Sequence, residues 1–127
     1  MRTIPKEESL DIEFKSDLKC YPDHDLIEEI VGMTNTAGGC LFLGVEDDGT
    51  ITGVHKKHRD PIGVTALIAN STVPPIAVRA EIITEEDKDV LKIASYSQDK
   101  ILSHSMVPAS NPHPSAEAVP GDWFSMY

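Results

Sequence analysis

Hydrophobic and polar positions alternate strictly near the start of the chain. Over residues 9–15, the apolar side chains of Leu10, Ile12 and Phe14 alternate with charged ones. A period of two residues is typical of a strand that buries one face, so a first strand is predicted here. Pro22 and the polar residues that follow it interrupt the pattern.

The apolar spacing then changes to three and four residues, which predicts a helix that begins at Asp25. Asp25 is placed to cap the helix, and Glu28 takes the third position, as in a capping box. The pair Gly38 and Gly39 is expected to end the helix. The residues expected on its buried face are Leu26, Ile27, Ile30, Val31 and Thr34.

An apolar run over residues 40–45 predicts a strand that is buried on both faces. The turn residues Asp47, Asp48 and Gly49 follow it, and the segment 50–54 is predicted as the returning strand of a hairpin.

The second half of the chain repeats the pattern of helix and hairpin. An Asp-Pro pair predicts the start of a second helix over 61–71. Segments 76–83 and 90–94 are predicted as strands around a charged turn at 85–88. The order β-α-β-β-α-β-β predicts one α/β (α+β) domain, with a mixed sheet and two helices packed on it.

A change of composition divides the chain into two parts. Residues 1–97 are predicted to form the folded domain, and residues 98–127 a proline-rich tail with an aromatic end at Trp123 and Phe124. Burial of aromatic side chains is more favourable than their exposure to water. The tail is therefore expected to pack on its own domain or to hold a homodimer together.

Composition excludes several classes of protein. No apolar run approaches the ~20 residues of a membrane span, and the first residues contain no apolar signal region. The two cysteines, Cys20 and Cys40, are too few for a disulfide scaffold or a four-cysteine zinc site. A cytoplasmic protein without membrane contact is therefore expected.

The net charge limits how the protein could bind a nucleic acid. Asp and Glu number 21 against 11 Lys and Arg, which gives a net charge of -10. The overall field therefore repels phosphates, and binding needs a local basic patch or a bridging metal. Lys56, Lys57 and Arg59 lie in a basic run and are predicted to contact phosphates. The alternative is that this run is a solvated loop.

A second candidate site is acidic. Glu13 and Lys15 are two residues apart on the first strand, so both side chains leave from one face. Glu8 and Asp47 could add further carboxylates, and the three acidic residues would then hold Mg²⁺ or Mn²⁺ while Lys15 faces a phosphoryl oxygen. The alternative is that Glu13 and Lys15 form an ordinary surface ion pair.

Several of these motifs together resemble a known family. The segments 8–15, 35–39, 43–49 and 51–54 are similar, in order and spacing, to the Schlafen AlbA-type (AlbA_2) domain. The similarity covers roughly residues 7–94. This domain is associated with DNA binding in bacterial and archaeal proteins, some of them labelled transcriptional regulators or helicase-related. The resemblance implies a compact α/β domain with a nucleic-acid-related role.

The resemblance also implies a site. In vertebrate Schlafens the corresponding fold forms an RNA-cleaving site from three acidic residues, which fall here on Glu8, Glu13 and Asp47, with Asp48 as the alternative to Asp47. The leading hypothesis is a nucleic-acid-binding regulatory domain that contacts DNA or RNA. A divalent-metal-dependent nuclease acting on RNA is the alternative, and a module for protein interaction or dimerisation is a third hypothesis.

Overall fold

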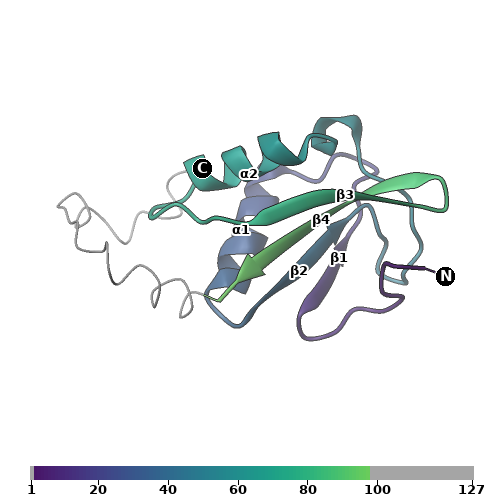
Figure 1. Ribbon diagram of the computed structural model, residues 1–127, viewed down its shortest axis with the longest axis horizontal. Helices are drawn as coiled ribbons and strands as arrows, with labels where there is room; N and C mark the ends of the chain where they lie inside the picture. The colour runs from purple at the N-terminus through teal and green to yellow at the C-terminus, as the bar shows by residue number, and fades with distance from the viewer. Residues whose placement is uncertain (1, 98–127) are drawn as a thin grey trace.

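The computed structural model describes residues 2–97, and these form a four-stranded sheet with two helices (Figure 1). The elements are β1 (Ile12–Lys15), α1 (Asp23–Thr34), β2 (Gly38–Leu43), the short 3-10 helix η1 (Lys56–His58), α2 (Pro61–Asn70), β3 (Arg79–Glu85) and β4 (Lys88–Tyr96). The predicted α+β class, with its mixed sheet and two helices, is confirmed.

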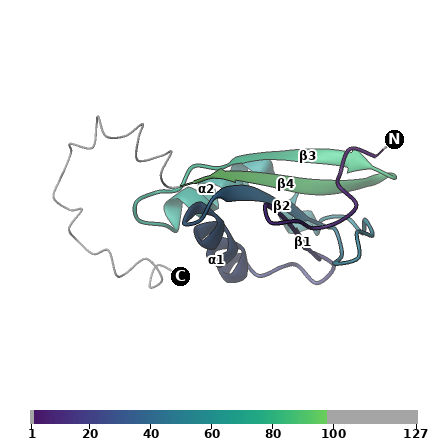
Figure 2. The same ribbon diagram turned by 90° about the horizontal axis from the view of Figure 1, so that it is seen from below.

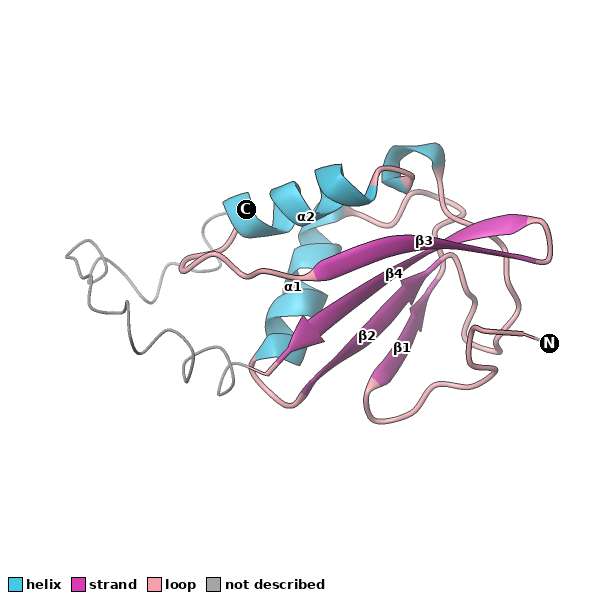
Figure 3. Ribbon diagram, viewed as in Figure 1, coloured by secondary structure: helices cyan, strands magenta, loops and turns pink. Residues whose placement is uncertain are grey.

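The strands lie in the order β1-β2-β4-β3 (Figure 3). β1 and β2 are parallel and are joined through α1, whereas β4 runs antiparallel to both of its neighbours. In the parallel pair, Phe14 lies opposite Phe42 and Lys15 opposite Leu43. The carboxyl ends of β1 and β2 therefore meet at one end of the sheet, where ligands commonly bind in sheets of this type.

Both helices cover the same face of the sheet (Figure 2). Leu41 and Leu43 of β2 point toward the helices, and Phe42 points to the opposite face, as strand geometry requires. The core on the helix side consists of Leu26, Ile27, Ile30, Val31, Leu41, Leu43, Val54, Val64, Ile68, Ile76, Leu91 and Ile93. The core on the opposite side consists of Ile4, Phe14, Phe42, Val45, Ile51 and Val90. All five residues predicted for the buried face of α1 are buried.

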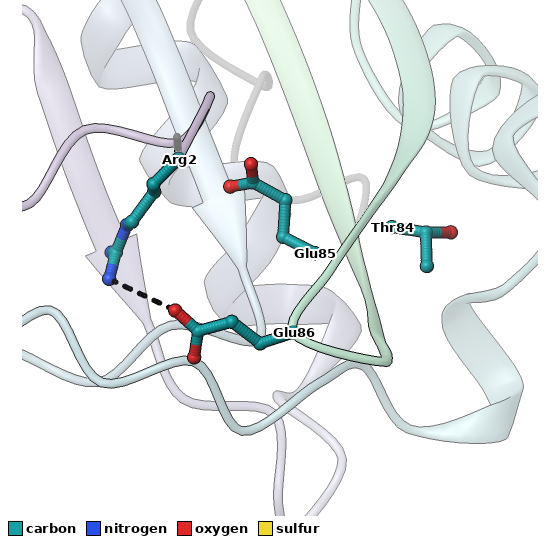
Figure 4. Close-up of a pocket in the computed structure, with 4 residues that line it drawn as sticks. All are labelled: Arg2, Thr84, Glu85 and Glu86. Carbon is teal, nitrogen blue, oxygen red and sulfur yellow. Dashed lines mark ion pairs between the residues drawn. The ribbon is translucent and has the colours of Figure 1, made fainter.

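The N-terminal segment covers the second core by inserting Ile4, which is buried. The Glu85 carboxylate accepts hydrogen bonds from the backbone N–H groups of Thr3 and Ile4, and these bonds hold the pKa of Glu85 below its ordinary value. Arg2 pairs with Glu86 at 3.9 Å (Figure 4). The cavity of about 420 Å³ at this place is therefore bounded by groups that fasten the N-terminus.

The predicted strand over 50–54 is wrong, because this segment forms only an isolated bridge between Val45 and Ile51. The reason is that β1 and β4 occupy both edges of β2, so no edge remains for a returning strand. The backbone turns at Gly44, which has a φ of +106°. The segment then continues as a loop, with Ile51 buried in the core on the side opposite the helices and Val54 buried in the core on the helix side.

The ends of the first strand and helix also differ from the prediction. Leu10 is fully exposed and β1 begins only at Ile12. α1 begins two residues early, at Asp23, and no side chain caps it. Asp25 thus lies inside the first turn, where a negative charge favours the helix dipole without acting as a cap.

The glycine pair has a different role from the predicted one. α1 ends at Thr34, and Asn35 is its C-cap. Gly38 instead opens β2 with a φ of +81°, and a Cβ atom there would lie 2.7 Å from the carbonyl oxygen of Ser95. Glycine is therefore needed for the close approach of β2 and β4. No helix among residues 2–97 is long and apolar enough to cross a membrane.

Candidate nucleic-acid interface and acidic site

A buried carboxylate ties together the loops that follow the two parallel strands. Asp17 comes two residues after β1 and has no exposed surface. Its oxygens accept hydrogen bonds from the backbone N–H groups of Tyr21, at 2.6 Å, and His55, at 2.7 Å. They also lie 2.8 and 3.0 Å from Nδ1 of His58, which is 3% exposed. One side chain thus fastens both loops.

The environment of this pair favours the charged form of each partner. Burial alone would raise the pKa of Asp17, but the hydrogen bonds from His58, His55 and Tyr21 outweigh it, and the pKa is lowered. The hydrogen bond to Asp17 raises the pKa of His58 against the opposing effect of burial. Nε2 of His58 lies 3.5 Å from the exposed carboxylate of Asp23.

The anchored loop exposes the three predicted phosphate-binding residues. Lys56, Lys57 and Arg59 are exposed, whereas His58 between them is buried. Within residues 2–97, no carboxylate lies within ion-pair distance of these three side chains. We call Lys56, Lys57 and Arg59 the basic loop. Its cations are presented on an anchored backbone and have no acidic partner in the described part of the chain.

A further cation, Lys19, belongs to the same region and was missed by sequence reasoning. Lys19 is exposed and lies in the loop between Asp17 and Tyr21, whose backbone is bound to the Asp17 carboxylate. No local motif marks Lys19, because its relation to the basic loop depends on a contact between residues 41 positions apart.

The acidic site lies on the helix-covered face at the edge strand β1. Nζ of Lys15 is 4.0 Å from Glu13 and 3.9 Å from Glu29 of α1. Lys15 also lies 6.0 Å from the ring centre of Tyr21. Glu29 was not predicted, because only the packing of α1 against the sheet brings it to β1.

Charge crowding at this site shows in the pKa values of two groups. Partial burial, followed by the carboxylates of Glu29 and Glu8, raises the pKa of Glu13, while Lys15 opposes this and Asp47 adds to it. Burial and the neighbouring carboxylates also raise the pKa of Tyr21 to about 12. The predicted acidic residues therefore influence one another electrostatically.

The two candidate carboxylates of the turn, Asp47 and Asp48, have different contacts. Asp48 accepts a hydrogen bond from the backbone N–H of Thr50, at 2.9 Å, and the hydrogen bonds from Thr50 lower its pKa. Asp48 thus stabilises its own turn. Asp47 is exposed and is the one of the two that acts on Glu13.

The acidic residues do not converge tightly. Glu8 accepts a hydrogen bond from the backbone N–H of Phe14 at 2.9 Å, so one of its oxygens already has a donor at the open edge of β1. Two triads of potential ligands among residues 2–97 have ligand atoms that all lie within 4.8 Å of one another. These are Asp17, Cys20 and His58, and the exposed group of His24, Asp25 and Glu28. Glu8, Glu13 and Asp47 are not such a triad.

A cavity of about 280 Å³ opens beside the basic loop. It is lined by Lys57 and His58, by the acidic residues Asp23 and Asp60, and by Val64 of α2. Since two carboxylates line this cavity, its electrostatic potential is less positive than that on the outer side of the loop.

The fold and these two sites define the class of protein: an α+β domain with loops anchored at the carboxyl ends of a parallel strand pair. The chain matches the Schlafen AlbA_2 family over residues 8–118 and belongs to that family. The resemblance predicted from the motifs is confirmed. The match also extends beyond residue 94, where the similarity of the motifs ends.

Solved structures include one with a similar fold. It is the solution NMR structure of the N-terminal domain of a protein from Nitrosomonas europaea, described as related to the ATP-dependent DNA helicase RecG. The TM-score is 0.50 at 21% sequence identity, and the alignment covers 71% of this chain and 65% of that chain. The chain thus spans somewhat less than two thirds of that domain. A search of curated proteins found no match.

Proposed function

We propose that this domain binds nucleic acid by contacting phosphates through the basic loop. The observation that carries the proposal is the Asp17 anchor, which buries His58 and leaves Lys56, Lys57 and Arg59 exposed without acidic partners. Cations without partners lose no ion pair when they bind a phosphate, and an anchored loop loses little conformational entropy. Membership of the Schlafen AlbA_2 family supports a nucleic-acid-related role.

The anchored loop also accounts for binding by a protein with a net charge of -10. Phosphate binding depends on the local potential within about 10 Å at moderate ionic strength, since salt screens the distant acidic groups. At moderate ionic strength the basic loop is therefore expected to bind phosphates despite the negative net charge.

The test compares two variants that remove the same charge. In the first, Lys56, Lys57 and Arg59 are all replaced by Gln. In the matched control, three other exposed cations, Lys6, Arg79 and Lys88, are replaced by Gln. Anisotropy of labelled duplex DNA and of labelled structured RNA gives the affinity over a series of salt concentrations.

The basic-loop variant should bind more weakly and should lose salt dependence. The slope of log K against log salt is negative, and each lost contact with duplex DNA makes it shallower by about 0.9. Three lost contacts therefore make it shallower by about 2.7. The control variant should keep the wild-type slope. Equal losses in both variants would show that only net charge matters and would refute the proposed interface.

A second function, metal-dependent cleavage of RNA, is favoured by the crowding of carboxylates around Glu13. We propose that Glu8, Glu13 and Asp47 hold Mg²⁺ or Mn²⁺ and that Lys15 lies beside the phosphoryl group. Burial raises the pKa of Glu13, and repulsion from Glu29 and Glu8 raises it further; a divalent ion would relieve this repulsion. When bound, such an ion would polarise a phosphoryl oxygen.

The acidic site can be tested by two measurements, the binding of Mn²⁺ and the cleavage of RNA. Glu13→Gln should abolish Mn²⁺ binding, measured by calorimetry, and also any Mn²⁺-dependent RNA cleavage. Glu81→Gln on the opposite edge strand is the control. Wild-type protein that binds no Mn²⁺ would refute this second function and leave the proposal for the basic loop standing.

The regulatory role and the dimerisation module stay predictions. The tail that was expected to mediate a homodimer lies outside the described residues.

A further inference from the structure

A cluster of three different ligand types lies beneath the basic loop. Asp17 follows β1, Cys20 lies in the turn before α1, and His58 ends η1. One ligand atom from each residue lies within 4.8 Å of the other two. Asp17 and His58 are buried, and Cys20 is partly buried.

We propose that Asp17, Cys20 and His58 form a binding site for a transition-metal ion of the zinc type. A carboxylate oxygen, a thiolate sulfur and an imidazole nitrogen are all ligands that Zn²⁺ accepts, and three protein ligands leave a fourth position open. The sulfur and nitrogen donors distinguish this site from the all-oxygen acidic site, which suits Mg²⁺ or Mn²⁺. The proposal does not depend on nucleic-acid binding.

The hydrogen bonds of Asp17 leave it able to bind a metal ion. A carboxylate offers about four lone-pair positions. The backbone N–H groups of Tyr21 and His55 take one position on each oxygen. Nδ1 of His58 faces both remaining positions with a single N–H, at 2.8 and 3.0 Å. A metal ion can therefore replace this hydrogen bond while both backbone bonds remain.

The turn that contains Cys20 directs the chain back toward the anchor. The backbone N–H of Cys20 donates to the carbonyl oxygen of Asp17 at 3.1 Å. Cys20 has a φ of +62°, a conformation that L-residues seldom adopt. It also lines an open cavity of about 350 Å³ together with Leu18 and Tyr21, so the residue lies at the solvent boundary. Binding converts the thiol to a thiolate and removes the proton from Nδ1 of His58, which becomes a ligand as a neutral imidazole with its remaining N–H at Nε2, and the displaced protons pass to the solvent.

The second cysteine is a natural control. Cys40 is also a free and partly buried thiol, but it lies on β2 opposite Ile12. Within residues 2–97 it belongs to no triad of potential metal ligands. A signal that depends on one cysteine and not on the other therefore identifies the site.

The experiment uses the full chain freed of metal with EDTA and then titrated with Co²⁺, the spectroscopic substitute for Zn²⁺. Wild type and Cys40→Ser should each show a near-ultraviolet thiolate-to-cobalt absorption band that saturates at one ion per chain. Zn²⁺ should displace the cobalt and abolish the band. Cys20→Ser should lack the band while its circular dichroism in EDTA matches that of wild type.

Several results would overturn the proposal. These are the absence of the band in wild type, its survival in Cys20→Ser, and its loss in Cys40→Ser. Cobalt bound without the band would place the ion at a site without a thiolate, such as the exposed His24, Asp25 and Glu28 group or the acidic site. X-ray absorption of the zinc-loaded wild type provides a measurement without any variant. One sulfur among the zinc ligands supports the site, and none or two refutes it.

Discussion

Replacing Asp17, a carboxylate with no exposed surface, with Ala should destabilise the domain strongly. The change removes the acceptor for three donors, the partly buried backbone N–H groups of Tyr21 and His55 and the buried ring N–H of His58. It also leaves His58 buried without its carboxylate.

The size of the effect follows from these contacts. A buried donor left without an acceptor costs about 1–3 kcal/mol, and removing one partner of a buried ion pair typically costs about 3–5 kcal/mol. We expect the free energy of unfolding to fall by about 3–5 kcal/mol, because the three lost bonds belong to one network and their costs are not additive. Asp17→Asn keeps one acceptor oxygen and should lose about 1–3 kcal/mol.

The assay is urea unfolding at neutral pH, with EDTA present so that no bound metal ion contributes. The midpoint should fall while the m-value stays constant. Asp11→Ala is the control, since the carboxylate of Asp11 is exposed and, within residues 2–97, accepts a hydrogen bond only from the hydroxyl of Ser9. The control should stay within about 0.5 kcal/mol of wild type. If Asp17→Ala does the same, the anchor does not hold the loops.

Three further results are expected. Gly38→Ala should lower the melting temperature because its Cβ would lie 2.7 Å from a backbone oxygen, whereas Gly32→Ala, with nothing within 4 Å, should raise it. Lys15→Met should raise the pKa of Glu13 further in an NMR titration, since Lys15 now lowers it; an unchanged value would contradict the contact. Glu85→Gln should destabilise the protein at neutral pH. Because the pKa of Glu85 is lowered on folding, the difference in stability from wild type should shrink as the pH falls through and below 4.5. A difference that does not change with pH would refute this role.

The sequence by itself determined the elements that have a clear period. The spacing of apolar residues located α1 and its buried face, and alternation located β3 and β4, because these patterns follow from local backbone geometry. The basic loop and its three cations were also visible, since charge is a property of the residues themselves.

The tertiary structure decided which edges pair and which side chains meet. The segment 50–54 has the pattern of a strand, yet β4 takes its place beside β2, and only the assembled sheet shows this. Glu29 reaches Lys15, and Asp17 reaches His58, across long stretches of sequence. Such contacts depend on how elements pack rather than on local spacing, so the acidic neighbour, the anchor and the Asp17, Cys20 and His58 cluster left no signature along the chain.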